Sequence, residues 1–333
     1  MTERVFCRNS YDKLRSIVLG KVDFRLLELV DSSERAVLET VFSETEQDLN
    51  DISIELTSRG VAVYRPTIAA NSSRPVELPT TTIPGLKMPL SPRDNFIVLG
   101  ETLLETSSWQ PERYFDYLCY QALFNRRFDW KKWVCMPRAV VQSYPDMLGN
   151  QSFVTSEMYF DAANIVKYND VLFVSTQDTC DLSGLAWFTK MFSDQYQIIQ
   201  VDDMSGHLDS HFNILRPGVI ISHHPRWRLP EFFKDWEIIQ VNPEYDEAHR
   251  VSQVMHSDLF QDDDIDNTVL TVNVLSIDQH TVMMYDHHKQ NRYLLDQFDR
   301  LGFEVVFVPF RHCYFFNQGL TCVILETGRW DDK

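Results

Sequence analysis

One supersecondary unit recurs along this chain and constrains its fold more than any other feature: a helical segment, a turn and a short apolar strand. The unit occupies residues 43–64, 187–201 and 293–309, and a further strand of the same kind is expected at 237–243. Recurrence of one unit favours modules packed around a common axis over a doubly wound sheet. α/β chains repeat such units generically, so the pattern alone leaves the doubly wound sheet open.

The first of these helices carries both a start and a stop signal. Ser43 stands three residues before Glu46, which is the spacing of a capping box, so the helix is expected to begin there. Gly60 is expected to end it, because glycine readily adopts the left-handed conformation that follows many helices. Between these signals the helical spacing places three apolar side chains on one face: Leu49, Ile52 and Leu56.

Composition limits the classes of partner. Of the 333 residues 44% are hydrophobic, which is enough for a large core, and we expect 1–333 to form a single domain. The formal charge of −17 repels phosphate backbones and anionic membranes, so neither nucleic acid nor a membrane is an expected partner. The chain opens without the apolar core of a signal peptide and has no apolar run of about 18 residues. A cytoplasmic protein is therefore expected, and the sequence leaves its oligomeric state open, a homodimer included.

The cysteines and acidic residues do not form a recognisable metal motif. Six cysteines lie far apart, which argues against zinc knuckles and a disulfide framework: Cys7, Cys119, Cys135, Cys180, Cys313 and Cys322. An aspartate run at 262–266 could suggest calcium, but it lacks the glycine and the closing glutamate of a calcium loop. We interpret that run as a solvated acidic loop.

Two other segments carry side chains suited to catalysis. His207, Asp209 and His211 follow a two-residue period, so in a strand they would share one face. They could then serve proton transfer or hold zinc, but no fourth ligand accompanies them and neither a metal nor a cofactor is expected. Cys322 follows a glycine-containing turn and precedes an apolar strand, where a thiol can be accessible. A satisfied polar pair and a buried structural cysteine are the alternatives for these two segments.

Several segments, taken in order, resemble the amidinotransferases and their guanidine-modifying relatives. They are NSYDKLRSIVLG at 9–20, PRDNFIVLG at 92–100, FDY at 115–117, FDAAN at 160–164, HLD at 207–209 followed by FN at 212–213 and Arg226, LTVNVL at 270–275, and finally Cys322. The similarity runs nearly from end to end. It implies a five-bladed α/β propeller, with ββαβ modules around a pseudo-fivefold axis and the active site in the central channel.

The resemblance also implies roles for individual residues. Cys322 would attack the guanidinium carbon of a donor such as arginine, giving an amidino-enzyme and a free amine. His207 would protonate the departing amine and later deprotonate an acceptor amine. Asp94 and Asp209 would hold cationic nitrogen groups, because carboxylates accept paired hydrogen bonds from a planar guanidinium.

Further positions are implied in the substrate pocket. Arg226 would pair with a substrate carboxylate, Thr271 would contribute a hydroxyl, and Asp161 would line the pocket. The position of Asn164 normally holds an aspartate that orients the histidine, and an amide there would weaken ordinary arginine chemistry by roughly 1.5–3 kcal/mol. Asp161, three residues earlier, is not expected to replace that carboxylate.

Other departures point the same way. Leu118 and Gln121 stand where the family usually has arginines, and Thr321 replaces the histidine common before the nucleophile, as in dimethylarginine hydrolases. The substrate could therefore differ from the family's usual one.

The leading hypothesis is amidino transfer from a guanidino donor, such as arginine, to an amine acceptor in specialised biosynthesis. An acyltransferase that uses the same cysteine and histidine on a thioester or amide donor, carrier-bound or free, is the alternative that Asn164 motivates. Hydrolysis of the guanidino donor and non-catalytic ligand binding also remain open.

Overall fold

The computed structural model describes residues 2–30, 32–68, 76–77, 82–83, 88–138, 141–145, 151–155, 158–242 and 268–332. The acidic loop predicted at 262–266 lies outside these residues. Among the helices of this part of the chain, none combines the length and the apolar character needed to cross a bilayer.

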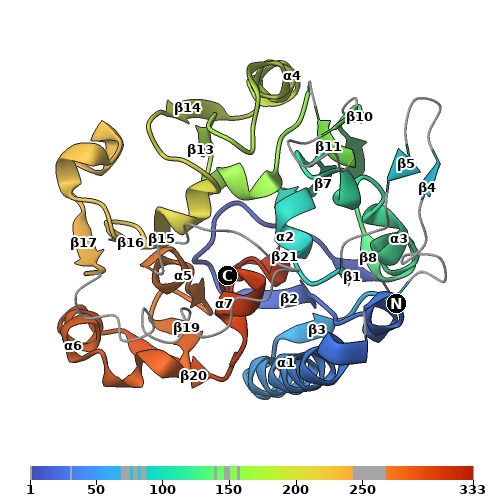
Figure 1. The fold of residues 1–333 in the computed structure, drawn as a ribbon. Helices are drawn as coiled ribbons and strands as arrows, with labels where there is room; N and C mark the ends of the chain where they lie inside the picture. Colours follow the sequence, from blue (N-terminus) through green and yellow to red (C-terminus); the bar gives the residue numbers. More distant parts are fainter. Residues whose placement is uncertain are drawn as a thin grey trace.

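Five three-stranded sheets form the frame of the described structure, and Figure 1 shows them arranged around a common centre. Their strand orders are β21(Ile324–Arg329)-β2(Leu14–Leu19)-β3(Ala62–Tyr64), β6(Phe96–Leu99)-β7(Thr102–Glu105)-β9(Lys132–Cys135), β12(Ile165–Tyr168)-β13(Val171–Ser175)-β14(Gln197–Val201), β15(Phe212–Arg216)-β16(Val219–Ser222)-β17(Glu237–Gln240) and β18(Leu275–Ser276)-β19(Thr281–Tyr285)-β20(Glu304–Val308). In every sheet the first two strands pair antiparallel and the last two parallel. This repetition confirms the predicted five-bladed α/β propeller and rules out one doubly wound sheet for the described residues.

Each parallel pair needs a crossover connection, and helices supply it in four blades. They are α1 (Ser32–Ser58), α3 (Tyr117–Arg127), α4 (Leu182–Phe192) and α6 (Arg292–Arg300), all at the periphery in Figure 1. The fourth blade uses two 3-10 turns instead, η5 (Arg226–Arg228) and η6 (Glu231–Phe233). The last strand, β21, pairs with β2 near the start of the chain, and this pairing closes the ring.

The start of the first helix differs from the sequence prediction. α1 begins at Ser32, so Ser43 and Glu46 lie inside the helix and form no capping box. The physical reason is burial: Leu38, Val41 and Phe42 continue the apolar face toward the N-terminus and are nearly fully buried. The predicted apolar face at 49–56 is confirmed, and Gly60 follows the helix with a φ of +82°.

Short helical turns precede the first strand of the blades and gather toward the centre of the ring. α2 (Pro92–Asn95) precedes β6, η3 (Ala162–Asn164) precedes β12, η4 (Leu208–Ser210) precedes β15, and α5 (Thr268–Val272) precedes β18. α2 packs against η3, η3 against η4, and η4 against α5, while α2 also contacts β21. The repeated module thus brings equivalent turns, distant in sequence, to one place.

The remaining elements lie outside the five sheets. They are the strand pairs β1 (Glu3–Arg4) with β8 (Phe128–Asp129), β4 (Val76–Glu77) with β5 (Thr82–Ile83) and β10 (Val141–Pro145) with β11 (Gln151–Thr155), and the helical turns η1 (Phe24–Leu29), η2 (Pro111–Arg113), η10 (Asp286–Gln290) and α7 (Cys313–Phe316).

Candidate active site

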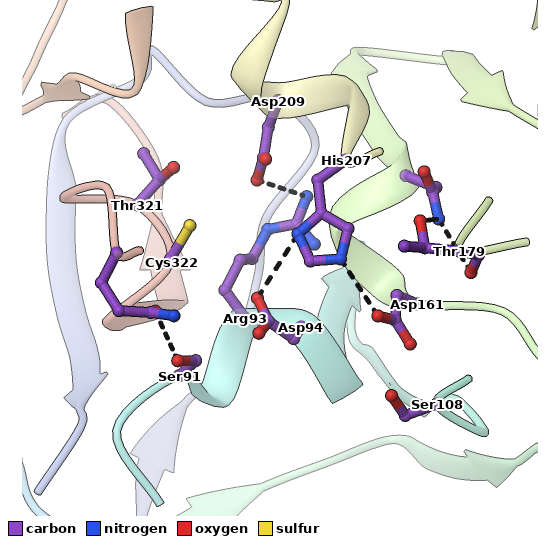
Figure 2. Close-up of polar contacts among 12 residues, drawn as sticks. Ser91, Arg93, Asp94, Ser108, Asp161, Thr179, His207, Asp209, Thr321 and Cys322 are labelled. Carbon is purple, nitrogen blue, oxygen red and sulfur yellow. Dashed lines mark hydrogen bonds and ion pairs between the residues drawn. The ribbon is translucent and has the colours of Figure 1, made fainter. Parts of the chain in front are cut away.

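The central turns carry most of the residues that the sequence singled out. Asp94 lies on α2, Asp161 is the residue before η3, and His207 is the residue before η4. Asp209 lies on η4 itself, and Cys322 stands two residues before β21. Figure 2 shows these side chains pointing toward one another.

His207 is held in a setting that favours its charged form. Its Nε2 lies 3.0 Å from Oδ2 of Asp161, and its Nδ1 lies 3.9 Å from Oδ1 of Asp94. Burial opposes the imidazolium and is the largest single influence on its pKa. The hydrogen bond that His207 donates to Asp161 and the charges of Asp94, Asp161 and Asp209 together outweigh burial and raise the pKa of His207 to about 9. The ring is therefore protonated at neutral pH and suited to give a proton away.

A buried ion pair fixes the orientation of Asp94. Its Oδ2 accepts a 2.7 Å contact from the guanidinium of Arg113, which also contacts Asp116 at 3.2 Å. The other oxygen of Asp94, Oδ1, is buried and has no hydrogen-bond partner. One oxygen is thus anchored while the other is left for a donor group.

Asp209 presents a second carboxylate. The residue is 2% exposed, both carboxylate oxygens lack a hydrogen-bond partner, and the nearest cation is Arg93 at 3.9 Å. Burial raises the pKa of Asp209, and the positive charges of Arg93 and His207 act in the opposite direction. Arg93 is itself engaged elsewhere, since its Nη2 donates to the Ile165 carbonyl at 2.6 Å. A cationic ligand bound here would offset the free-energy cost of burying the Asp209 carboxylate without a hydrogen-bond partner.

Cys322 is positioned by a network around Asn273. The side-chain oxygen of Asn273 accepts hydrogen bonds from the amide and hydroxyl of Thr321 and lies 3.9 Å from the Cys322 sulfur. The Asn273 amide donates to the carbonyl of Asp209 at 3.3 Å, so one side chain links the cysteine loop to η4. Gly319 permits this approach, because a Cβ there would lie 2.3 Å from Asn273 Cγ.

The thiol is mainly protonated in this state. The residue is only 6% exposed, so burial raises the pKa of Cys322 well above its usual range, and the carboxylates of Asp209 and Asp94 raise it further. A backbone hydrogen bond from Gly319 and the charge of Arg93 act in the opposite direction. The sequence suggested that a thiol at this junction can be accessible, whereas the structure buries Cys322.

The negative charges of Asp94 and Asp209 raise the pKa of both Cys322 and His207. Figure 2 shows Arg93 and Asp94 beside the space between the two side chains. A cavity adjoins this cluster and is lined by Arg93, Asp209 and Thr321, together with Ser10 and Glu326. The arrangement brings a thiol, an imidazolium and two carboxylates to one place.

One sequence expectation must be corrected. Asp161, which had been set aside as too distant, is the carboxylate that contacts His207. Asn164 instead donates to the Thr179 carbonyl at 3.2 Å and to its hydroxyl at 2.8 Å, and its amide is directed to Thr179 rather than to the histidine. The reason is the 3-10 turn at 162–164, which turns the residue before it toward η4 and the residue at its end toward Thr179.

The predicted shared face of His207, Asp209 and His211 is also wrong. These residues form a 3-10 turn, not a strand, so the two-residue period does not apply. His211 contacts His224 and the Ser205 carbonyl, and the three side chains do not form a zinc site.

Of the other predicted pocket residues, Arg226 lies away from the cluster and Thr271 lies on a central turn. Arg226 does not reach the cluster, because its guanidinium donates to the carbonyls of Phe233, Lys234 and Trp236 at 2.7–2.9 Å. Thr271 is buried on α5, which packs against η4. The two positions that depart from the family, Leu118 and Gln121, are exposed on α3.

Three residues that sequence reasoning passed over organise the site. Arg93 and Asn273 fall inside the segments PRDNFIVLG and LTVNVL, so their place in a motif was a signal that could have found them. Arg113 stands three residues before Asp116 and pairs with both that residue and Asp94. Nothing in its local sequence indicates the second of these pairs.

Comparison with known proteins places this geometry among relatives. Inosamine-phosphate amidinotransferase 1 of Streptomyces griseus is 26% identical over 261 residues, which cover 71% of this chain and 75% of that protein. Mitochondrial glycine amidinotransferase of Danio rerio is 26% identical over 262 residues, covering 72% of this chain and 58% of that protein. No protein-family model matches the chain.

A solved structure extends the likeness over the whole fold. SxtG, an amidinotransferase of Microseira wollei in the saxitoxin biosynthetic pathway, matches with a TM-score of 0.78 over 98% of both chains, at 20% identity. The propeller and the sequence relatives agree with the resemblance found in the ordered motifs. The chain is an enzyme of the amidinotransferase family.

Proposed function

We propose that this enzyme transfers an amidino group from a guanidino donor such as arginine to an amine acceptor through a covalent intermediate on Cys322. The observation that carries the proposal is the pair of buried carboxylates beside the thiol. Asp94 and Asp209 together present three oxygens without a hydrogen-bond partner. Planar guanidinium groups satisfy such oxygens with paired, charge-assisted hydrogen bonds.

Donor binding would also activate the nucleophile. Asp209 and Asp94 raise the pKa of Cys322 while they are uncompensated. A guanidinium bound between them neutralises this effect and places its own positive charge near the sulfur, so the thiol can lose its proton. The thiolate therefore forms when a substrate is present, which limits reaction with other electrophiles.

In the first half of the reaction the Cys322 sulfur bonds to the guanidinium carbon, and the bond from that carbon to the donor's substituted nitrogen breaks. His207 gives its proton to this nitrogen, so the donor leaves as a free amine and the enzyme carries an amidino group. Asp161 holds the imidazolium through the 3.0 Å hydrogen bond before that transfer.

In the second half the acceptor amine enters the position that the first product vacates. Neutral His207 removes a proton from the acceptor nitrogen as this nitrogen bonds to the amidino carbon. The carbon–sulfur bond breaks, the thiolate leaves, and the product is a new guanidino compound. Water in place of the amine would give hydrolysis, so exclusion of water distinguishes transfer from hydrolysis.

The site charge argues against the acyltransferase alternative. That hypothesis rested on a neutral site created by Asn164. Asp161 supplies the carboxylate on His207 in its place, and Asp94 and Asp209 add two more. A neutral acyl donor would leave the oxygens of Asp94 and Asp209 without a partner, which is unfavourable in a buried site.

A product assay tests the proposal. Purified enzyme is mixed with arginine and a panel of primary amines, and ornithine and new guanidino compounds are measured. The proposal predicts that ornithine release depends on an amine and disappears in Cys322→Ser. Cys135→Ser is the matched control, because Cys135 is a free, exposed cysteine on β9 and should leave turnover intact.

If citrulline formed in the absence of an amine, the activity would be hydrolysis of the donor and not amidino transfer. If a wide range of guanidino donors gave no amine product at all, while candidate thioesters gave acyl transfer to amines, the proposal would be refuted.

A further inference from the structure

A cluster of three histidines lies at the end of the hairpin formed by β15 and β16, separate from the cysteine site. His211 directly precedes β15, and His223 and His224 directly follow β16. The antiparallel register pairs Phe212 with Ser222, so it brings the two flanking segments together. One ring nitrogen from each histidine lies within 4.8 Å of the other two.

The three rings pack closely in a largely enclosed place. Ring centroids are 5.0 Å apart for His211 and His224, 4.1 Å for His223 and His224, and 5.4 Å for His211 and His223. His211 and His224 are buried, and His223 is partly buried. Neutral imidazole rings at such distances can direct one nitrogen lone pair each to a shared ion.

Hydrogen bonding determines which nitrogen of His211 carries the lone pair. Its Nε2 lies 2.5 Å from the Ser205 carbonyl oxygen, which can only accept, so Nε2 bears the proton. In a neutral ring Nδ1 then carries the lone pair, which accepts a hydrogen bond from Nε2 of His224 at 2.8 Å. Metal-binding histidines typically donate their second ring N–H to a backbone carbonyl in this way.

We propose that His211, His223 and His224 bind a divalent transition-metal ion such as Zn²⁺. Imidazole nitrogens suit Zn²⁺, Co²⁺, Ni²⁺ and Cu²⁺, and three histidines with water in the fourth position form a common tetrahedral site. The absence of a metal motif in the sequence is no obstacle, since the ligands come from two strand ends twelve residues apart. The inference is independent of the proposed function, because it concerns a different cluster.

The required movement is small for one pair and larger for the third ring. At a metal–nitrogen distance of about 2.0–2.1 Å, tetrahedral ligand atoms lie about 3.3 Å apart. The bonded nitrogens of His211 and His224, now 2.8 Å apart, would separate by about half an ångström as the ion takes the place of the proton between them. That proton would move to Nδ1 of His224, so both rings stay neutral. His223 would turn inward, which its partial exposure permits.

Such an ion would also stiffen the segment that carries the proton donor. Ser205, which accepts the His211 hydrogen bond, stands two residues before His207. Gly206 between them has a φ of +78°, a conformation that costs glycine little. Metal bound to His211 would hold this turn from one side, while Asp161 holds His207 from the other.

Cobalt(II) is the best probe, because its visible absorption reports both coordination and ligand type. The full chain, first freed of metal with a chelator, is titrated with Co²⁺ and then with Zn²⁺. We expect one Co²⁺ per chain, the d–d bands of a four- or five-coordinate ion without thiolate-to-cobalt charge transfer, and displacement by Zn²⁺.

His223→Gln is the decisive variant, since it removes one ligand but leaves the buried contact between His211 and His224 in place. It should weaken Co²⁺ binding at least tenfold and abolish any rise in melting temperature caused by Zn²⁺. His280→Gln is the matched control, because His280 is exposed on another blade. Absence of d–d bands in the parent protein, thiolate charge transfer, or equal binding by His223→Gln would each overturn the proposal.

Discussion

Replacement of Asp161 by asparagine tests how the site controls its proton donor. The change is nearly isosteric. The Oδ1 of an asparagine can still accept the hydrogen bond that the Trp109 backbone N–H now donates to Asp161 at 3.3 Å. What it removes is the charged hydrogen bond to His207 and one of the three carboxylates that raise the pKa of the ring.

The size of the effect follows from these contacts. A hydrogen bond to a charged group contributes about 1.5–3 kcal/mol, and one pKa unit corresponds to about 1.4 kcal/mol. Asp161→Asn should therefore lower the pKa of His207, now about 9, by about 1–2 units. Activity that needs protonated His207 should decline at a correspondingly lower pH.

Linkage gives the matching change in stability. The folded-state pKa of His207 lies above its ordinary value of 6.5, so the stabilisation is fully present below about pH 6.5 and is lost as pH rises through about 9. In Asp161→Asn this loss should occur at lower pH. The free energy of unfolding of the two proteins should therefore converge in alkaline solution.

NMR titration of the histidine ring carbons in the full chain measures this pKa, with His207→Gln used to assign the signal. Asp170→Asn is the control, because Asp170 is a well-exposed carboxylate paired with Arg8 and should leave the pKa unchanged. An unaltered pKa in Asp161→Asn, or an equal fall in the control, would refute the reasoning.

Three further predictions follow from the other contacts. Asn164→Asp should lower the free energy of unfolding by about 1–3 kcal/mol in urea melts, because a carboxylate cannot donate the two hydrogen bonds that Thr179 accepts; unchanged stability would contradict this. Gly319→Ala should reduce kcat roughly 100-fold, since its Cβ would displace Asn273, and near-normal turnover would show that Asn273 does not position the cysteine loop. Arg226→Ala should lower the melting temperature but leave the KM for the guanidino donor unchanged, because its guanidinium is held by backbone carbonyls; a large rise in KM would restore its predicted role.

Much of the fold was predictable because its signals are local. The apolar face at 49–56 and the left-handed Gly60 determine one helix and its end, and the same unit repeats at other blades. The beginning of α1 was not predictable from its capping pattern, because tertiary burial of Leu38, Val41 and Phe42 extends the helix. The fourth blade replaces a helix with 3-10 turns around Pro225 and Pro230, which the repeat alone does not reveal.

The sequence indicated which residues form the site better than it indicated which residues contact one another. The ordered motifs indicated Cys322 and His207, which the central turns bring to the same pair of carboxylates. Which of Asp161 and Asn164 faces the histidine depends on the direction of a single 3-10 turn, and sequence spacing does not determine that direction. The histidine cluster depends on the register of one hairpin, which is likewise a property of the folded chain.

The mass of the Cys322 peptide after brief incubation with a guanidino donor, followed by acid quenching and digestion, tests the central claim most directly. The account predicts the addition of one amidino group to this peptide, its absence in Cys322→Ser, and its loss when an amine acceptor is added. An unmodified Cys322 in enzyme that is releasing product, or an amidino group on another cysteine, would contradict it.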